Sequence, residues 1–218
     1  MLPMNGHPIQ IRLLGPPQVL RDGQPVEGWR SRKALGLLGY LALSDGPVTR
    51  PALAELLWPA SDESRGRANL SWALNHVTGL LPGCLAADRH TLRFVRDEAG
   101  IFLDSDHFRR LKRRNTVEAL EEAVSLVQGE LLDGFSLDGC PDFELWLVQE
   151  RERWQRLVAD AWSTLIAHHR FAGNYETAVA YARRLLAYLP WQESAHRHLM
   201  LLLALSGRRS AALAQYEI

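Results

Sequence analysis

The sequence has few cysteines and no excess of either charge. Its 218 residues include only two cysteines, Cys84 and Cys140, which lie far apart and form no CxxC pair. This spacing suggests neither a zinc site nor a disulfide framework, and it fits a reducing compartment. Lys and Arg together number 25, as do Asp and Glu, so the formal net charge is zero. Any surface that attracts a polyanion must therefore be a local basic patch.

Long apolar runs and catalytic signatures are also missing. No run approaches the roughly 18 apolar residues that span a membrane, and the polar start MLPMNGHPIQ is not a signal peptide. We therefore expect a cytoplasmic protein without a membrane partner. The sequence contains no GxSxG, GxxxxGK[ST] or HExxH motif. It predicts no enzyme, no cofactor and no metal site.

Two histidine pairs and two aspartate pairs are the remaining candidates for site chemistry: His168 with His169, His196 with His198, Asp104 with Asp106, and Asp133 with Asp138. Helix residues that are adjacent or two apart do not share a face. Surface or capping roles are therefore favoured for the histidines over metal binding. Capping and loop solvation are favoured for the aspartates over acid–base catalysis.

The most informative stretch is residues 64–81, SRGRANLSWALNHVTGLL, which predicts a helix. At 3.6 residues per turn its apolar side chains gather on one face: Leu70, Ala73, Leu74, Val77, Leu80 and Leu81. The other face carries Arg65, Ala68, Ser71, Trp72, Asn75 and His76. A Trp among small polar residues is unusual on an ordinary surface and indicates a contact face.

The elements around this helix predict a winged helix-turn-helix. Helices are expected at residues 31–43 and 51–58, and a hairpin at 85–87 and 91–95. An antiparallel sheet is expected before them, from a strand at 9–14 and a hairpin at 18–27 around Asp22-Gly23. In a winged helix-turn-helix the second helix of the motif enters the major groove. The alternative is a small α+β core whose helix exposes one Trp.

Basic side chains flank the predicted groove-reading helix. Arg30, Arg32 and Lys33 begin the first helix, where the helix dipole does not favour cations, so phosphate contact would explain them. Arg89 and Arg93 lie on the hairpin. A solvated helix start and a solvated loop tip are the respective alternatives. The full set of candidate DNA-binding residues is Arg30, Arg32, Lys33, Arg50, Arg65, Arg67, Ser71, Trp72, Asn75, His76, Arg89 and Arg93.

The second half predicts an all-α region with an internal repeat. Residues 172–178, AGNYETA, are echoed 34 positions later by SGRRSAA at 206–212. This step is the tetratricopeptide (TPR) period, with Ala178 and Ala212 where paired helices pack closely. Pro190 separates the intervening helices. A linker is expected at 96–103, short helices at 104–112 and 115–128, and a long helix at 142–169. Four tryptophans are predicted to pack between helices: Trp146, Trp154, Trp162 and Trp191.

Residues 8–98 resemble the winged-helix domain of antibiotic-regulatory-protein (SARP) transcription factors, which is similar to the OmpR-type winged helix. The matching stretches are WRSRKALGLLGYLAL and LAELLWPASDESRGRANLSWALNHVTGLL, and the most specific match is Leu57-Trp58-Pro59 followed by Ala68-x-Leu70. The family's third helix usually carries several Arg residues in its second half. This chain has His76, Thr78 and Gly79 there.

The second half resembles the bacterial transcriptional activator domain that follows the winged helix in the same family, through GELLDGFSLDGCPDFELWLVQERERW and ARRLLAYLPWQESAHRHLMLLLALSGRRSAALAQYE. We therefore expect a mainly α fold with small β sheets. Residues 1–98 are expected to form the winged helix-turn-helix, and residues 99–218 a TPR-like activator domain truncated at its C-terminus.

The resemblance implies a cytoplasmic transcriptional activator. The implied partners are promoter duplex DNA and RNA polymerase, with self-association on direct-repeat sites. The alternative is a protein-interaction scaffold that kept the winged fold without tight DNA binding. The number of basic residues on the outer face of helix 64–81 discriminates the two, because phosphate neutralisation drives DNA affinity.

Overall fold

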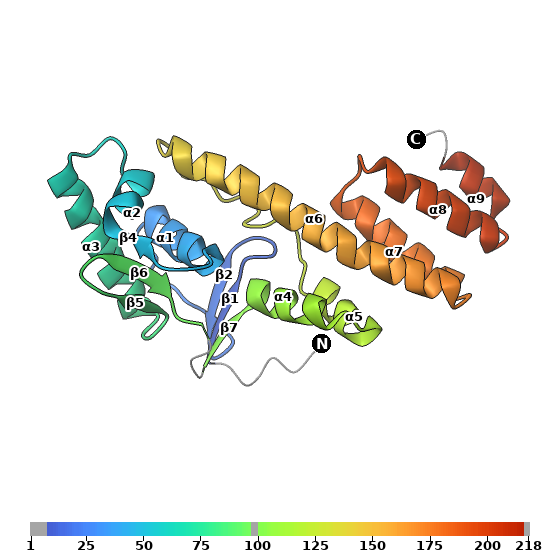
Figure 1. Cartoon of the computed structure of the whole chain (residues 1–218), viewed down its shortest axis with the longest axis horizontal. Helices are drawn as coiled ribbons and strands as arrows, with labels where there is room; N and C mark the ends of the chain where they lie inside the picture. Colours follow the sequence, from blue (N-terminus) through green and yellow to red (C-terminus); the bar gives the residue numbers. More distant parts are fainter. Residues whose placement is uncertain (1–7, 97–99, 216–218) are drawn as a thin grey trace. The chain divides into compact units, whose positions relative to one another are not determined.

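The computed structural model describes residues 8–96 and 100–215 (Figure 1). Residues 97–99 of the predicted linker and residues 216–218 at the chain end lie outside the described part. The chain divides into two compact units, which are described one at a time. Unit 1 comprises residues 1–105 and 131–150, and unit 2 comprises residues 106–130 and 151–218. The predicted domain boundary between residues 98 and 99 stays a prediction.

Unit 1 contains two small sheets and three helices in the order expected for a winged helix-turn-helix. Its elements are β1 (Ile9–Arg12), β2 (Gln18–Arg21), β3 (Gln24–Pro25), α1 (Arg32–Leu43), β4 (Val48–Thr49), α2 (Arg50–Leu57), α3 (Glu63–Leu80), β5 (Leu85–Ala87), β6 (Thr91–Phe94) and β7 (Ile101–Leu103). One sheet has the order β3-β2-β1-β7, and the other has the order β4-β6-β5. The antiparallel pair β5–β6, here called the wing, is the predicted hairpin.

Local sequence signals explain where the helices of unit 1 begin. The side chain of Ser31 accepts a hydrogen bond from the Lys33 backbone N–H before α1. Asp62 does the same for Arg65 before α3. Such caps satisfy backbone N–H groups that have no partner inside the helix. Both helices therefore begin within a residue of the predicted start.

The predicted linker at 96–103 is wrong over its last three residues. Ile101–Leu103 forms β7, which pairs in parallel with β1, Ile9 lying opposite Ile101. Phe102 and Leu103 are buried in this position. Three residues are too few to show a strand period, so the pairing with a segment about 90 positions earlier was invisible locally.

Asp104 holds the chain that leaves β1. Its carboxylate, 2% exposed, accepts hydrogen bonds of 2.8–2.9 Å from the backbone N–H groups of Leu13 and Leu14. It also accepts one of 2.7 Å from the N–H of Ser105. Burial raises the pKa of Asp104 to about 6, and the hydrogen bonds from Leu14, Leu13 and Ser105 oppose that rise. Asp104 thus joins the two adjacent ends of β1 and β7.

We expect the stabilisation that depends on Asp104 to fall as pH rises from about 4 to 6. The pKa in the folded protein lies above that of an unfolded aspartate, so the folded state binds this proton more tightly in that range. The contribution is fully present below the unfolded pKa and is lost as pH rises through the folded pKa. A shift of this size corresponds to about 3 kcal/mol.

Urea unfolding of wild type and Asp104→Asn at pH 4 and pH 7 measures this effect, because Asn does not titrate. The difference in free energy of unfolding between the two proteins should be smaller at pH 7. A difference that stays constant or grows would contradict the expectation.

Residues 131–150 pack with unit 1 although they follow α5 in the sequence. A side chain at Gly36 in α1 would place its Cβ 2.8 Å from Cδ1 of Leu137, so glycine allows this close approach. The Cys140 thiol donates to the carbonyl of Leu57 at 3.2 Å. The rings of Tyr40 and Trp146 pack against each other at a tilt of 55°, with centroids 4.6 Å apart.

Unit 2 is helical. The remaining helices of the chain are α4 (Asp104–Arg114), α5 (Val117–Ser125), α6 (Pro141–Phe171), α7 (Tyr175–Tyr188), α8 (Glu193–Leu205) and α9 (Arg209–Ala214), with α4 and α6 beginning in unit 1. Trp154 is fully buried, and its ring meets Phe108 edge-on at 5.6 Å. The mainly α fold with small β sheets is confirmed.

The 34-residue repeat is visible in the backbone. Gly173 and Gly207 both have positive φ, 76° and 79°, where the helices before them end. The residues that follow donate equivalent hydrogen bonds, Asn174 to the carbonyl of His169 and Arg208 to that of Leu203, both at 2.8 Å. Ala178 and Ala212 are buried at the predicted close-packing positions. The TPR-like reading of this part is confirmed.

Two side-chain predictions in unit 2 are wrong. His169, expected in a surface or capping role, is only 9% exposed and stacks on Tyr181 with ring centroids 5.6 Å apart. Trp191, expected between helices, is 74% exposed. The local sequence around His169 and Trp191 does not reveal which of the two side chains is buried. Their burial depends on how neighbouring elements pack in the folded chain.

Among the described residues, no helix is long and apolar enough to cross a membrane.

Candidate nucleic-acid interface

Helix α3 separates a buried face from an exposed one as its periodicity predicts. Leu70, Ala73, Leu74 and Val77 are buried, whereas Leu80 is half-buried. The outer face of α3 consists of Arg65, Ala68, Ser71, Trp72, Asn75 and His76. All six are exposed except His76, which is half-buried. The buried stripe anchors the helix, so the outer face is held in a defined orientation.

An aromatic cluster stands on the outer face. Trp72 is 47% exposed, and its ring stacks on His76 with centroids 5.1 Å apart and planes 7° apart. His76 meets Trp29 edge-on at 6.2 Å. Its Nε2 accepts a hydrogen bond of 3.2 Å from the backbone N–H of Arg30, which requires the neutral ring with its proton on Nδ1. His76 thus covers one face of the Trp72 indole, and the side chain of Trp72 remains partly exposed to solvent.

The basic cluster at the start of α1 separates in the structure. Arg32 donates from Nε and from its terminal nitrogen to the carbonyl of Ser136 at 3.3 and 3.2 Å, and it lies over the ring of Phe135. Lys33 lies over the ring of Trp58 at 5.6 Å. Arg30 is exposed. Two of the three cations therefore have intramolecular contacts, and Arg30 is the one placed beside the aromatic cluster.

The candidate residues near the start of α3 are exposed but differ in their contacts. Arg67 forms an ion pair with Glu63 one turn earlier, at 3.4 Å. Ser71 donates its hydroxyl to the carbonyl of Arg67 at 2.9 Å. Arg65 contributes its backbone N–H to the Asp62 cap, while its side chain is exposed. Arg65 is therefore the cation of α3 best placed to meet an anion.

The wing is held to the start of α2. Arg50 donates from Nε to the carbonyl of Asp88 at 3.0 Å, and its backbone N–H donates to His90. Asp88 accepts hydrogen bonds from the N–H groups of His90 and Thr91 and from the Thr91 hydroxyl. Hydrogen bonds from Thr91 and then His90 lower the pKa of Asp88 to about 2. The turn is thereby fixed in one conformation.

Arg89 and Arg93 are both exposed on the wing. Trp72, Asn75 and Arg65 lie on one face of α3, and the two wing arginines are exposed on their hairpin. Arg32, Lys33 and Arg50 are instead engaged in contacts within unit 1. Which of these residues touch DNA stays a prediction.

Sequence reasoning missed two residues that shape this interface, Trp29 and Asp88. Trp29 supports His76 from a segment without regular structure, and no local pattern predicts that contact. Asp88 was recognisable, because an Asp side chain in a turn often accepts hydrogen bonds from backbone N–H groups a few residues later, as in an Asx-turn.

In the part of the chain that the structure describes, no three His, Cys, Asp or Glu side chains are grouped to hold a metal.

Comparisons with known proteins agree with this architecture. Residues 103–218 match the family model "Bacterial transcriptional activator domain". The structure is similar to that of Mycobacterium tuberculosis EmbR, solved in complex with a low-affinity phosphopeptide, with a TM-score of 0.69 and 22% identity. The match covers 96% of this chain and 58% of EmbR, so the chain spans a little over half of that protein's length. No curated protein sequence matches.

The EmbR likeness shows the fold, and the family match covers more than half of the sequence. The SARP-type resemblance is confirmed, because residues 103–218, which include the activator-domain stretches, match the family model and the fold of the chain is similar to that of EmbR. The chain belongs to the bacterial transcriptional activator domain family of SARP-type transcription regulators.

Proposed function

We propose that the chain is a transcriptional regulator that binds promoter DNA through unit 1 and contacts the transcription machinery through unit 2. The observation that carries the DNA-binding part is the outer face of α3. There an exposed Trp72, stacked on His76, shares one helix face with exposed Asn75 and Arg65. A helix-turn-helix presents such a face to the major groove.

Each residue of this face suits a different contact. Asn pairs bidentately with adenine in the major groove, which assigns base reading to Asn75. Trp72 offers an apolar plane for a thymine methyl group or a sugar. Arg65 lies at the helix start and is suited to a phosphate, which sets position without reading sequence. Arg30, Arg89 and Arg93 supply further phosphate contacts.

The tandem helices of unit 2 support the second part of the proposal. Helix pairs that repeat along a chain present an extended surface to a protein partner. The family implies RNA polymerase as that partner, and the proposed regulator has no catalytic role. If each copy of the chain binds its DNA site in the same orientation, several copies would assemble side by side on direct-repeat sites.

We expect Asn75→Ala to relax base preference at one position of the selected site by about 1–3 kcal/mol. Arg65→Ala should instead weaken binding to all sequences alike, because a phosphate contact carries no base information. Selection from random duplexes with the 218-residue chain measures both effects. Arg183→Ala, an exposed arginine on α7, is the control that should leave selection and affinity unchanged. Run-off transcription from the selected site then tests the polymerase contact.

Two results would contradict the proposal in different ways. If wild type enriches no sequence, the scaffold alternative leads, and the intramolecular contacts of Arg32, Lys33 and Arg67 explain the weak affinity. If Asn75→Ala leaves the site unchanged while Trp72→Ala unfolds unit 1, α3 is a structural element and does not read bases.

A further inference from the structure

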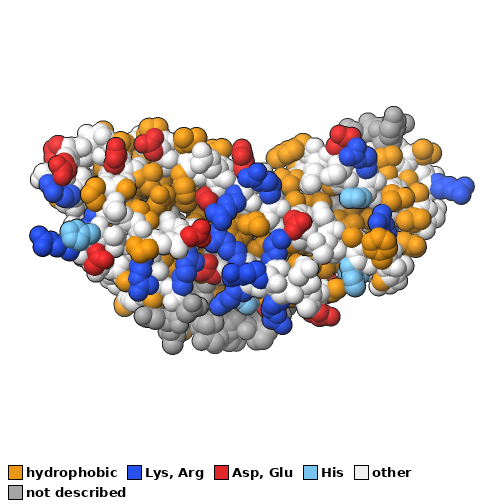
Figure 2. Space-filling view, in the orientation of Figure 1, with side chains coloured by type: hydrophobic (Ala, Val, Ile, Leu, Met, Phe, Trp, Pro, Cys, Tyr) orange, Lys and Arg blue, Asp and Glu red, His pale blue; other side chains and the backbone are white. Residues whose placement is uncertain are grey.

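A pocket within unit 2 is lined mainly by cations. It has a volume of about 700 Å³ and lies between α4 and α6. Its lining residues are Arg109, Lys112, Arg113, Arg153, Arg156, Leu157 and Asp160, and we call it the α4–α6 pocket. Figure 2 shows Lys and Arg side chains gathered over this part of unit 2. Five positive groups and one carboxylate make the pocket strongly cationic in a chain with no net charge.

The helical register produces this concentration. On α4 the cations follow a spacing of three and four residues from Arg109, and on α6 the lining residues begin at Arg153 and recur every three or four positions. Residues at these spacings share one helix face. The two helices therefore turn cationic stripes towards the same pocket.

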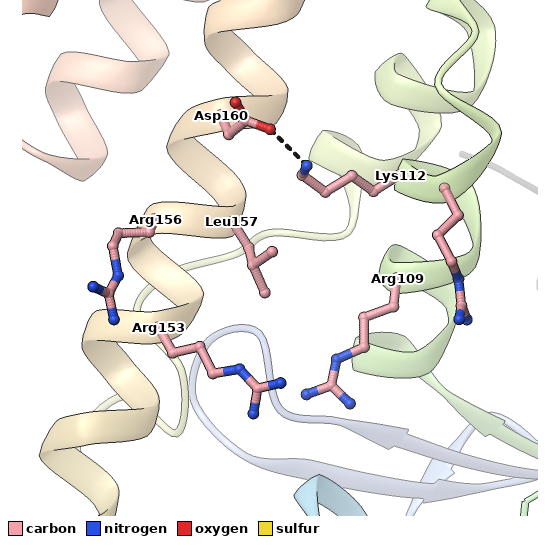
Figure 3. Close-up of a pocket in the computed structure, with 7 residues that line it drawn as sticks. Arg109, Lys112, Arg153, Arg156, Leu157 and Asp160 are labelled. Atoms are coloured by element: carbon pink, nitrogen blue, oxygen red, sulfur yellow. Dashed lines mark hydrogen bonds and ion pairs between the residues drawn. The ribbon is translucent and has the colours of Figure 1, made fainter. Parts of the chain in front are cut away.

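Figure 3 shows how the labelled side chains are arranged in the pocket. Arg109 and Arg153 extend towards each other from opposite helices. Lys112 pairs with Asp160 at 2.6 Å on the other side of Leu157. Asp160 therefore pairs with Lys112, and the guanidinium groups of Arg109 and Arg153 face each other across the pocket. An anion placed between two guanidinium groups is attracted by both of them.

Arg109 is held in place before any ligand arrives. Its guanidinium lies 5.0 Å above the ring of Trp154, which is fully buried. Its side chain is only 18% exposed, and Asp106 lies 4.0 Å away. A guanidinium held this way loses little side-chain entropy when it binds an anion, which favours affinity.

We propose that the α4–α6 pocket binds a small organic anion with two or more phosphate groups, of about nucleotide size. The volume falls within the range of small-molecule sites. Paired guanidinium groups match phosphate oxygens bidentately. Leu157 and the arginine stems provide an apolar surface for the organic part of the ligand. The site is an effector site in unit 2, separate from the DNA interface of unit 1.

Titration calorimetry of the 218-residue chain with pyrophosphate and with adenosine diphosphate tests the proposal. Both probes should bind, and Arg153→Gln should weaken binding roughly tenfold, the effect of losing a charged hydrogen bond. Lys112→Gln should also weaken binding, because it leaves the Asp160 carboxylate without its cation beside the bound anion. Asp160→Asn should strengthen binding several-fold, because it removes a negative charge that repels the anion and frees Lys112 from its ion pair. A merely structural role would not produce this gain. Arg183→Gln is the matched control and should change nothing.

Several results would overturn the proposal. They are the absence of binding by both probes, equal losses in Arg153→Gln and Arg183→Gln, or binding of pyrophosphate without adenosine diphosphate. If polyglutamate or random duplex DNA binds through Arg153 and Lys112 while neither probe binds, the pocket is a macromolecular contact. Duplex selection with Arg153→Gln separates this proposal from the proposed function, because that variant should select the wild-type DNA site.

Discussion

Trp154→Ala is expected to lower the free energy of unfolding of unit 2 by about 3–5 kcal/mol. Trp154 is fully buried, and its ring packs edge-on against Phe108 and beneath the guanidinium of Arg109. Truncation removes these contacts and leaves a cavity between α4 and α6 that the two helices cannot fully close. The loss is a large part of the stability of an ordinary domain. Urea unfolding followed by far-UV circular dichroism measures it.

Trp191→Ala is the matched control, because it makes the same chemical change at a side chain that is 74% exposed in the same unit. Its cost should stay within about 0.5 kcal/mol. Trp154→Phe should cost much less than Trp154→Ala. It keeps an aromatic ring and removes an indole N–H that has no hydrogen-bond partner in the described part of the chain. Equal costs for the two Trp→Ala variants would show that burial at Trp154 does not support unit 2.

Leu70→Ala is expected to lower the free energy of unfolding of unit 1 by about 2–5 kcal/mol. Leu70 is 1% exposed and lies in the middle of the stripe that packs α3 against the core. DNA affinity should fall with it, because the outer face of α3 keeps its orientation only while the stripe is packed. Thermal unfolding and duplex binding of the same preparation measure the two effects.

Leu145→Ala is the control for this variant, since Leu145 belongs to unit 1 and is 59% exposed. It should change neither stability nor DNA affinity appreciably. If Leu70→Ala retains wild-type stability and still loses DNA affinity, Leu70 would act through a contact other than core packing. That result would remove the argument that the buried stripe positions the reading face.

Elements with a strong local signal were predictable to within a few residues. Helix α3 was predicted at 64–81 and spans Glu63–Leu80, because an Asp cap and an apolar stripe both lie within the segment. The wing and the Asp22-Gly23 hairpin were predictable because short strand-like segments flank residues that favour a tight turn. The TPR-like period was readable because Gly173 and Gly207 recur 34 residues apart.

The candidate interface was predictable only in its outline. The exposure of Arg65, Trp72 and Asn75 followed from helical periodicity alone. The contacts of Arg32 with Ser136 and of Lys33 with Trp58 did not, because each side chain meets a residue distant in the sequence. These contacts decide which cations are already engaged within unit 1, so the charge that the face can offer to an anion depends on the tertiary structure.

The sequence by itself determined the order of the elements, the faces of the helices and the repeat, since caps, turns and periodicity act over a few residues. Only the tertiary structure decided that Ile101–Leu103 joins β1, that Asp104 holds the backbone of Leu13, and that residues 131–150 pack with unit 1. It also decided that Arg109 and Arg153 face each other. Partners that are tens of residues apart are selected by packing and hydrogen bonding in the folded chain, and local sequence carries no trace of them.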